Sequence, residues 1–252
     1  MTKIDVEKII SWIRDYFAKN SWAKGAILGM SGGKDSLVVA KLCAEALGRD
    51  HVLGVIMPNG NMKDIDDAVE SCKIMGIDYK VVNISSVYND ILNIVTPVIK
   101  EKVEKVNSIT TINIAPRVRM TVLYSIGASL DYLVANTSNL SEFEVGYTTK
   151  WGDNVGDFAP IANFTKSEVC EIGLLLGLPE KLVNKTPSDG LSGMSDEQNM
   201  GFLYKDLDEF IRTGKVGLEH DKISKSHKNS EHKRLGVCKY QNDLPNYFDK
   251  KK

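Results

Sequence analysis

The segment GAILGMSGGKDS, residues 25 to 36, says more about the fold of this chain than any other stretch. Its first half is a short apolar run of the kind that forms a buried strand. The second half is rich in Gly and Ser and is followed by LVVAKLCAEALG, which predicts a helix that ends at Gly48. A strand, a glycine-rich turn and a helix in this order gather backbone N–H groups at a helix N-terminus, where an anion binds favourably. The segment therefore predicts a phosphate-binding loop.

The turn SGGKDS (31–36) differs from the two most common nucleotide-binding motifs. The G-x-x-x-x-G-K-[ST] motif, if it ended at Gly33 and Lys34, would require a glycine at position 28 and a hydroxyl at position 35, but the chain has Leu28 and Asp35. Nor does the turn match the G-x-G-x-x-G dinucleotide fingerprint. The alternative interpretation, which needs no ligand, is a tight glycine turn with a Ser or Asp helix cap.

Short apolar runs recur along the chain and predict three further strands, at residues 51–57, 79–84 and 131–135. Helical segments lie between them, among them 64–75, which has acidic residues in its first turn. Strands that alternate with helices at this spacing predict the α/β class, with a doubly wound, Rossmann-like parallel sheet covered by helices on both faces. Ligands of such sheets bind at the carboxyl ends of the strands, where SGGKDS and NTSNLSE (136–142) both begin.

The rest of the chain adds helices and a polar tail. Pro116 predicts a helix that begins there, because proline suits the first helical position. Capping boxes, in which a Ser or Thr is followed one turn later by Glu or Gln, predict helices at 165–176 and from 195 to near 214. The segment near 218–252 is basic and polar. We expect it to be a mobile lid that closes over phosphates, with a solvated, unstructured terminus as the alternative.

Composition limits the class of protein. The chain of 252 residues is 42 % hydrophobic and 26 % charged, which is typical of one folded domain and excludes a disordered or fibrous protein. Its net charge is −1, so no nucleic acid or membrane partner is expected from bulk charge. The sequence has no C-x-x-C pair, no apolar run of about 18 residues and no signal-peptide core at its N-terminus. We therefore expect a cytoplasmic protein with reduced thiols.

SGGKDS resembles the S-G-G-x-D-S signature of the ATP pyrophosphatases, the PP-loop members of the adenine-nucleotide α-hydrolase group. The resemblance implies a loop that grips the β- and γ-phosphates of ATP. Attack then falls on the α-phosphorus, and ATP is converted to AMP and pyrophosphate. The carboxylate of Asp35 fits this chemistry, because a cation such as Mg²⁺ between it and the triphosphate would remove their repulsion.

Further segments resemble the ammonia-dependent NAD synthetases, and they keep the order and spacing of that family. They are NIAPRVRM (113–120), NTSNLSEFEVGYTTKWGD (136–153), DFAPIANFTK (157–166), KTPSDGL (185–191), SDE (195–197) and EHKR (231–234). The resemblance implies a single NAD synthetase domain over 1–252 without a glutaminase domain, so that free ammonia is the nitrogen donor. The implied reaction amidates nicotinic acid adenine dinucleotide (deamido-NAD) through an adenylate intermediate and gives NAD, AMP and pyrophosphate.

The resemblance also implies roles for individual residues. Those implied for ATP, the co-substrate, are Gly29, Met30, Ser31, Gly32, Gly33, Lys34, Asp35, Ser36, Thr137, Lys166 and Ser188. Those implied for deamido-NAD are Arg117, Lys150, Asp157, His232 and Lys233, with Asn113 and Tyr124 as softer candidates. The implied ligands of Mg²⁺ are Asp35 and Glu142. The implied catalytic set is Asp35, Glu142, Lys166 and Asp153, and Asp153 would help to deprotonate ammonium.

Two different activities remain compatible with such a phosphate loop. One is that of a PP-loop ligase acting on tRNA, although the near-zero net charge and the missing C-x-x-C pairs count against it. The second is that of a non-catalytic ATP-binding regulator, which would have no need of Asp35, Glu142 and Lys166 together. Taken alone, Thr137 fits a helix cap and Arg117 fits an exposed helix face.

The same resemblance implies a homodimer. Helices from the middle of the chain form the interface in this family and complete the dinucleotide site. In this sequence the apolar segment 87–106 and the helix after Pro116 would supply that surface.

Overall fold

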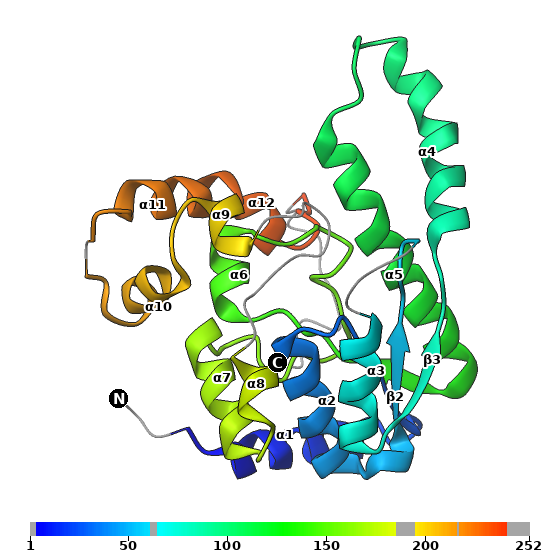
Figure 1. The fold of residues 1–252 in the computed structure, drawn as a ribbon, viewed down its shortest axis with the longest axis vertical. Helices are drawn as coiled ribbons and strands as arrows, with labels where there is room; N and C mark the ends of the chain where they lie inside the picture. Colours follow the sequence, from blue (N-terminus) through cyan, green and yellow to red (C-terminus); the bar gives the residue numbers. More distant parts are fainter. Residues whose placement is uncertain (1–3, 61–64, 185–194, 216, 241–252) are drawn as a thin grey trace.

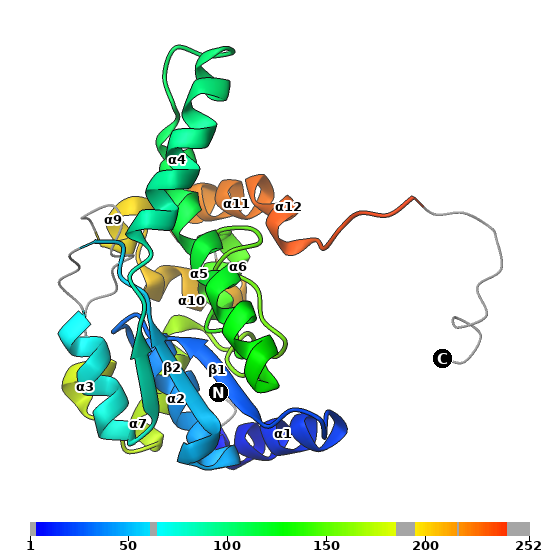
Figure 2. The same ribbon diagram turned by 90° about the vertical axis from the view of Figure 1, so that its right-hand side faces the viewer.

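A parallel four-stranded sheet forms the centre of the molecule, of which the computed structural model describes residues 4–60, 65–184, 195–215 and 217–240. All the strand pairs are parallel, and the order is β3-β2-β1-β4. Figure 2 shows β1 and β2 side by side. The predicted doubly wound parallel sheet is confirmed, because β1 lies inside the sheet and the chain moves outward from it in both directions. The strands are β1 Gly25–Gly29, β2 Val52–Ile56, β3 Asp78–Val81 and β4 Tyr132–Val134.

Helices cover both faces of this sheet and extend beyond its edge. The helices of the sheet layers are α1 Val6–Lys19, α2 Lys34–Leu47, α3 Ile65–Met75, α4 Ser85–Lys100, α5 Ser108–Leu130 and α7 Lys166–Leu175, with a 3₁₀ turn at Arg49–His51. The shorter helices are α6 Leu140–Val145, α8 Glu180–Val183, α9 Asp196–Met200, α10 Tyr204–Thr213, α11 His220–Asn229 and α12 Glu231–Arg234. Within the described ranges, none of these helices combines the length and the apolar character that crossing a bilayer requires.

Alternation along β1 divides the interior into two cores. Ala26 and Leu28 pack into the core that α1, α2 and α7 share, whereas Ile27 between them packs into the core beneath α4 and α5. All three side chains are fully buried. Successive side chains of a strand point to opposite faces, so a run of apolar residues buries both faces at once. This burial fixes β1, and with it the place where the glycine-rich turn emerges.

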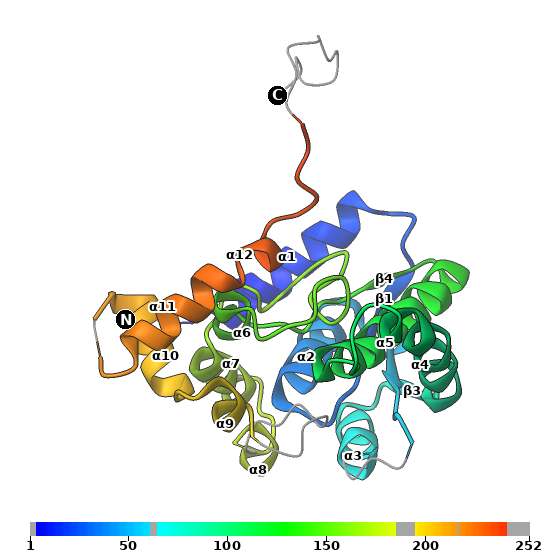
Figure 3. The same ribbon diagram turned by 90° about the horizontal axis from the view of Figure 1, so that it is seen from above.

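The C-terminal helices form a third, smaller core. Val145 of α6, Leu207 of α10 and Ile223 of α11 are buried together, with Phe202 and the ring of Tyr204. Figures 1 and 3 both place α10 and α11 next to α6, on the side of the molecule away from α3 and α4. The C-terminal quarter therefore packs against the segment that follows β4.

Helix α4 and the first half of α5 project from the body of the molecule as an arm (Figure 1). No residue of α4 is buried, and Ile94 and Val98 are 70 % and 62 % exposed. Ile109 at the start of α5 is 61 % exposed. The arm thus carries a row of large apolar side chains that the described part of this chain does not cover.

Two predicted helix boundaries are wrong. The helix expected to begin at Pro116 begins at Ser108, because the side chain of Asn107 caps it by accepting from the backbone N–H of Ile109. The helix expected from 195 to near 214 is two helices, α9 and α10. Gly201 stops the first with a left-handed backbone (φ 78°), a conformation that glycine adopts at little cost.

Candidate active site

A cavity of about 320 Å³ opens at the carboxyl ends of β1, β2 and β4. The loop after β1 forms its floor and the loop after β4 forms one wall. Every residue predicted for ATP within the described ranges lines it, from Gly29 to Ser36 together with Thr137 and Lys166. Ser188 lies outside the described residues. The structure therefore gathers segments that are far apart in the sequence into one site.

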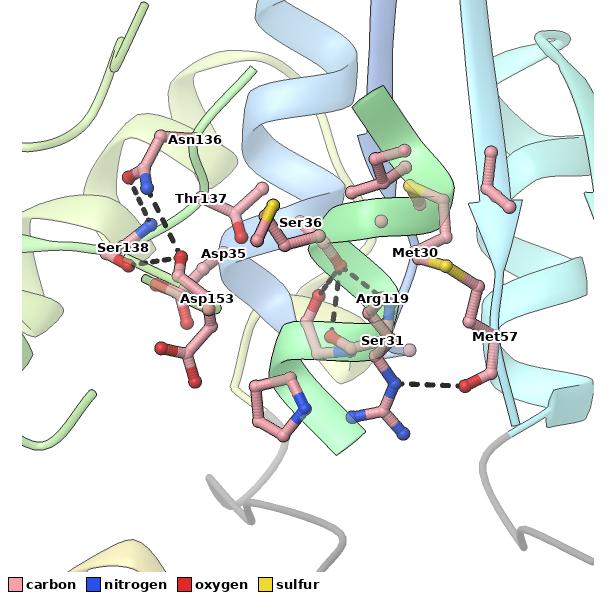
Figure 4. A pocket seen from close by; sticks show the side chains of 18 of the residues that line it. Met30, Ser31, Asp35, Ser36, Met57, Arg119, Asn136, Thr137, Ser138 and Asp153 are labelled. Atoms are coloured by element: carbon pink, nitrogen blue, oxygen red, sulfur yellow. Dashed lines mark hydrogen bonds between the residues drawn. The ribbon is translucent and has the colours of Figure 1, made fainter. Parts of the chain in front are cut away.

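The glycine-rich turn is closed by hydrogen bonds between its own residues. Ser31 Oγ accepts from the backbone N–H of Gly33 at 3.2 Å, and Ser36 Oγ donates to the Gly33 carbonyl at 3.0 Å (Figure 4). Gly32 has a φ of 78°, which a side chain would strain. Helix α2 starts directly afterwards at Lys34, and no described side chain caps its N-terminus. Its first N–H groups are therefore directed toward the cavity as donors for an anion.

Lys166 lies between the two carboxylates that were predicted to bind magnesium. Its ammonium is 2.7 Å from Asp35 Oδ2 and 2.8 Å from Glu142 Oε1. The three residues come from the first turns of α7, α2 and α6, so three separate helix starts meet at this place. The side chain of Lys166 is only 7 % exposed, which excludes a role as an ordinary surface lysine.

Burial and neighbouring charges shift the pKa values of Lys166 and Glu142 in opposite directions. Burial would lower the pKa of the Lys166 ammonium, but Asp35 and Glu142 outweigh burial and raise the pKa above its ordinary value. Burial raises the pKa of Glu142 to about 7, with Lys166 acting against the rise and Asp35 adding to it. Lys166 therefore stays positively charged, and Glu142 takes up a proton more readily than an exposed glutamate does.

Asn139 connects the Asp35 carboxylate to the backbone of Glu142 and was missed at the sequence level. Its side-chain oxygen caps α6 by accepting from the Glu142 N–H at 3.0 Å, and its amide donates to Asp35 Oδ1 at 3.1 Å. Asn139 is completely buried. The only sequence signal was Asn one turn before Glu, which is a helix-start pattern. That pattern predicts the cap but not the second bond, which depends on the packing of α6 beside α2.

Asp153 lies in the wall of the cavity opposite the glycine-rich turn (Figure 4). Its carboxylate accepts from the Thr149 N–H at 2.6 Å, and its backbone carbonyl accepts from the side chains of Asn136 and Ser138, both at 3.2 Å. Burial raises the pKa of Asp153 to about 6. A carboxylate with this pKa is ionised at neutral pH and can accept a proton there.

Arg119 is a second residue of the cavity that the sequence did not single out. It lines the cavity from α5, and its Nε donates to the Met57 carbonyl at 3.0 Å (Figure 4). Burial lowers the pKa of its guanidinium below the ordinary value. From the sequence, Arg119 fits an exposed helix face, because only the packing of α5 on the sheet shows which side of the helix is inward.

The residues predicted for deamido-NAD do not line the cavity. Arg117 donates to the Lys150 carbonyl at 3.2 and 3.3 Å, and Lys150 donates to the carbonyl of His232. Lys233 donates to the carbonyls of Gly146 and Thr148, both at 2.7 Å. These residues lie in or around the loop at 146–157, which follows α6 and is hydrogen-bonded to both α5 and α12. We call this group of residues the outer layer: Asn113, Arg117, Lys150, His232 and Lys233.

Tyr124 and Asp157 meet at the end of β4, where Asp157 is exposed and Tyr124 is half-buried. Asp157 Oδ2 accepts from the Val134 N–H at 2.7 Å, and the Tyr124 hydroxyl donates to Asp157 Oδ1 at 3.4 Å. Burial raises the pKa of Tyr124 to about 12. Asp157 therefore anchors the strand end through the backbone, and neither residue is among those that line the cavity.

The donor set of the cavity fits magnesium. Carboxylate oxygens are the ligands that this ion takes, and it usually binds through one or two carboxylates together with substrate phosphates and water. Asp35 and Glu142 already share one cation, the ammonium of Lys166. No cluster of three or more His, Cys, Asp or Glu that could hold an ion by itself occurs among residues that the structure describes. The pair is thus suited to an ion that substrate phosphates help to hold.

Comparison with known proteins agrees with this arrangement. The sequence model of the NAD synthase family matches residues 5–243. A relative from Thermococcus sibiricus, an NH(3)-dependent NAD(+) synthetase, is 43 % identical over 207 residues, which is 82 % of this chain and 78 % of the relative. A second NH(3)-dependent NAD(+) synthetase, from Carboxydothermus hydrogenoformans, is 42 % identical over 231 residues and covers 90 % of this chain and 93 % of the relative.

Solved structures resemble the fold over the same length. An NMN synthetase from Francisella tularensis has a TM-score of 0.85 at 30 % identity, with 94 % of this chain and 97 % of that chain covered. An NH3-dependent NAD synthetase from Campylobacter jejuni has a TM-score of 0.73 at 27 % identity, with 95 % and 100 % covered. The family match over nearly the whole sequence, the relatives above 40 % identity and the shared fold lead to one conclusion: this chain belongs to the NAD synthase family.

Proposed function

We propose that this chain is an ammonia-dependent NAD synthetase, a ligase that forms a carbon–nitrogen bond. It uses ATP to activate the carboxylate of deamido-NAD and passes the acyl group to ammonia, which gives NAD, AMP and pyrophosphate. The observation that carries the proposal is the meeting of Asp35, Glu142 and Lys166 beside the glycine-rich turn in one cavity. Family membership supports the same activity.

Activation is needed because a carboxylate is a poor acceptor for a nucleophile. Transfer of AMP to it creates a mixed anhydride with a good leaving group, and neutral ammonia can then attack the acyl carbon. Two polyanionic nucleotides must be held together during this step, so cations and oriented N–H donors matter more than a nucleophilic side chain. The cavity supplies Lys166, Arg119 and the first N–H groups of α2.

Each group then has a defined task. The turn from Ser31 to Ser36 binds the β- and γ-phosphates of ATP, and Lys166 holds phosphate oxygens while Asp35 and Glu142 keep its ammonium in place. Asp153 accepts a proton from ammonium, because only neutral ammonia is a nucleophile. The aliphatic side chains of Val55, Met57 and Ile65 line the same cavity, and an apolar wall of this kind suits the faces of a purine base.

Asp35 and Glu142 would hold Mg²⁺. When bound, the ion would screen the triphosphate and stabilise the charge that develops on pyrophosphate as it leaves. Asn139 orients the Asp35 carboxylate by one hydrogen bond and holds the backbone of Glu142 by the other, and this pre-organisation keeps the pair ready for a cation.

The dinucleotide site belongs to the same proposal. The outer layer carries the positive charge of Arg117, Lys150 and Lys233 near the loop at 146–157, which suits a second, longer polyanion beside the ATP cavity. The arm formed by α4 and the start of α5 has exposed apolar side chains, which supports a homodimer in which a second copy of the chain covers the arm. The free thiols at all four cysteines support a location in the cytoplasm.

Synthesis of NMN is the second candidate function. The NMN synthetase from Francisella tularensis has the TM-score of 0.85, above the 0.73 of the NAD synthetase from Campylobacter jejuni. The chemistry would be the same, but the acid would be a mononucleotide and would need no contact with the outer layer.

One assay separates these functions. The purified chain is incubated with ATP, Mg²⁺ and ammonium, together with either deamido-NAD or nicotinic acid mononucleotide, and the products are identified by chromatography. We expect NAD, AMP and pyrophosphate from deamido-NAD. Efficient NMN formation with little NAD would establish the second candidate, and release of ADP or an absence of turnover with both acids would contradict the whole family of reactions. Omission of ammonium is the control.

A further inference from the structure

Helix α10 presents two polar side chains to the active site from outside the cavity. Tyr204 is its first residue, and Asp208 follows one turn later on the same face. Both are buried, with 5 % and 7 % of their surface exposed. The one other buried residue of this helix, Leu207, belongs to an apolar core, so the two polar groups have to be explained by what they contact.

Asp208 holds the starts of α6 and α7 together. Its Oδ1 accepts from Ser141 Oγ at 2.5 Å, and its Oδ2 accepts from the backbone N–H of Ser167 at 2.8 Å. Ser141 Oγ in turn accepts from the Lys166 N–H at 2.9 Å. A carboxylate at a helix N-terminus satisfies donors that the helix itself leaves open and interacts favourably with the helix dipole. Asp208 therefore holds the backbone of Ser167 directly and, through the Ser141 hydroxyl, the backbone of Lys166.

Tyr204 acts on the side chains of Lys166 and Glu142. Its ring lies 5.1 Å from the ammonium of Lys166, the position of a cation over an aromatic face. Its hydroxyl donates to Asp196 Oδ2 at 3.2 Å and lies 3.5 Å from Glu142 Oε1. The ring restricts the path of the Lys166 side chain, and the hydroxyl limits how far the Glu142 carboxylate can turn away from Asp35.

The apolar core does not account for these contacts. The ring of Tyr204 packs with Val145, Phe202 and Leu207, but its hydroxyl adds nothing to apolar packing. A surface ion pair also holds α10 against α7: Arg212 Nη2 is 2.5 Å from Glu168 Oε2. The apolar core and the ion pair would thus hold α10 in place even if Tyr204 and Asp208 had no polar partners near the active site.

We propose that Tyr204 and Asp208 are positioning residues for the reaction: α10 uses them to hold Lys166 and Glu142 where the phosphates of ATP and its metal ion are bound. The inference rests on the proposed function for its link to catalysis. Its structural content, that α10 sets the geometry of this pair, concerns only the binding of ATP with Mg²⁺ and can be measured without turnover.

The test uses two variants of the full-length chain and one matched control. Tyr204→Phe keeps the ring and removes the hydroxyl, and Asp208→Asn keeps the size of the side chain and removes its charge. Arg212→Ala breaks the exposed contact between α10 and α7: Arg212 binds Glu168 and the Asn163 carbonyl, and it has no hydrogen bond to the side chain of Lys166 or Glu142. Two quantities are measured for each: the steady-state constants, and the Mg²⁺ concentration that gives half of the thermal stabilisation by ATP.

We expect Tyr204→Phe and Asp208→Asn to raise this Mg²⁺ concentration by roughly tenfold and to lower kcat by roughly 10- to 100-fold, as is usual when the partners of metal ligands are removed. At saturating Mg²⁺ the KM for ATP should change by less than about threefold, because excess metal ion restores the binding of ATP and leaves the loss in kcat. Arg212→Ala should lower Tm but leave both quantities near wild type.

Several results would overturn the inference. A Tyr204→Phe variant with the same Mg²⁺ requirement and kcat as Arg212→Ala would do so, and so would a loss of activity in parallel with Tm across all three. If Asp208→Asn does not fold, the Mg²⁺ requirement and kcat of Tyr204→Phe alone decide whether the inference holds. A wild-type chain that makes no NAD would contradict the proposed function, while the Mg²⁺ requirement for stabilisation would still test the role of α10.

Discussion

The cavity and the outer layer use similar side chains in different ways. In the cavity, Lys166 faces two carboxylates at 2.7 and 2.8 Å, so charge is matched by charge in a buried place. In the outer layer, the ammonium of Lys233 is engaged by the carbonyls of Gly146 and Thr148, and Arg117 by the carbonyl of Lys150. The two carboxylates of the cavity are placed so that they could also bind a metal ion. The outer layer holds the loop at 146–157 and α12 in place, and its cations become available to a ligand only by exchanging partners.

The difference follows from where the residues lie on the fold. Strand ends in a parallel sheet are fixed by the core on both faces, so the turn after β1 and the helix after β4 are rigidly placed. The outer layer depends instead on docking of short helices near the C-terminus. Substitutions at Lys166, Asp35, Asp153 and Lys233 test this contrast.

Removal of the central cation should have the largest effect. Lys166→Met leaves Asp35 and Glu142 facing each other without the charge between them, and we expect kcat to fall by about 10³-fold, because a buried, oriented cation is lost where negative charge develops. The measurement is single-turnover formation of AMP. Lys181→Met, at an exposed lysine of α8, is the control, since its side chain is 69 % exposed. Activity within about threefold of wild type in Lys166→Met would show that the cavity does not act as proposed.

Asp35 should come next. Asp35→Ala removes one carboxylate but leaves Glu142 and Lys166 paired, so we expect a fall in kcat of about 10²-fold together with a weaker dependence on Mg²⁺. Asp66→Ala is the matched control, because Asp66 is also an acidic residue in the first turn of a helix and is exposed. Wild-type turnover by Asp35→Ala would remove this residue from the mechanism.

Asp153 gives a prediction on pH. Its pKa is raised from 3.8 to about 6, so the folded protein binds the proton more tightly than the unfolded chain, and wild-type stability falls as the pH rises through this interval. Asn does not titrate. Relative to wild type, Asp153→Asn should therefore gain unfolding free energy as the pH rises from about 4 to 7, by an amount that solvent screening of this exposed side chain keeps small.

Urea denaturation at several pH values measures this difference, and Asp206→Asn, at an exposed position of α10, is the control. The same Asp153→Asn variant should lose about tenfold in kcat at neutral pH, because a proton acceptor for ammonium is gone. A stability difference that does not change with pH would contradict the raised pKa.

Lys233 should show the smallest effect and separates the two regions most directly. Lys233→Met removes two hydrogen bonds to carbonyls near the C-terminus of α6, and we expect a loss of about 1–2 kcal/mol of stability, visible as a lower Tm. The KM for deamido-NAD should rise by about threefold while kcat changes little. Lys228→Met on α11 is the control, because Lys228 is exposed. An unchanged Tm with a much higher KM would mean that Lys233 serves the ligand alone.

Prediction from the sequence succeeded where a feature of the site is formed by residues that are close together in the chain. The turn from Ser31 to Ser36 could be located because a strand before it and a helix after it are both visible as apolar patterns. The capping box at Thr165 predicted the start of α7, and the structure has both of its hydrogen bonds. Such features depend on neighbours in the chain and need no knowledge of the fold.

Prediction failed where partners come from distant segments. Asn139, Arg119, Tyr204 and Asp208 have contacts that depend on how α5, α6 and α10 pack, and a single sequence does not show which face of a helix turns inward toward a particular residue. The boundary at Pro116 was wrong for a different, local reason. Proline at the first helical position is a preference, and the cap at Asn107 prevailed over it.

The class of the fold, the succession of strands and helices along the chain and the phosphate loop could all be inferred from the residues alone, because hydrophobic periodicity and glycine-rich turns act locally. Three further features became apparent only in the folded molecule: Lys166 is shared by Asp35 and Glu142, Asn139 and α10 hold this group, and Lys233 caps a helix end rather than lining the cavity. Hydrogen bonds and ion pairs between distant segments are fixed by packing, and packing is a property of the whole chain.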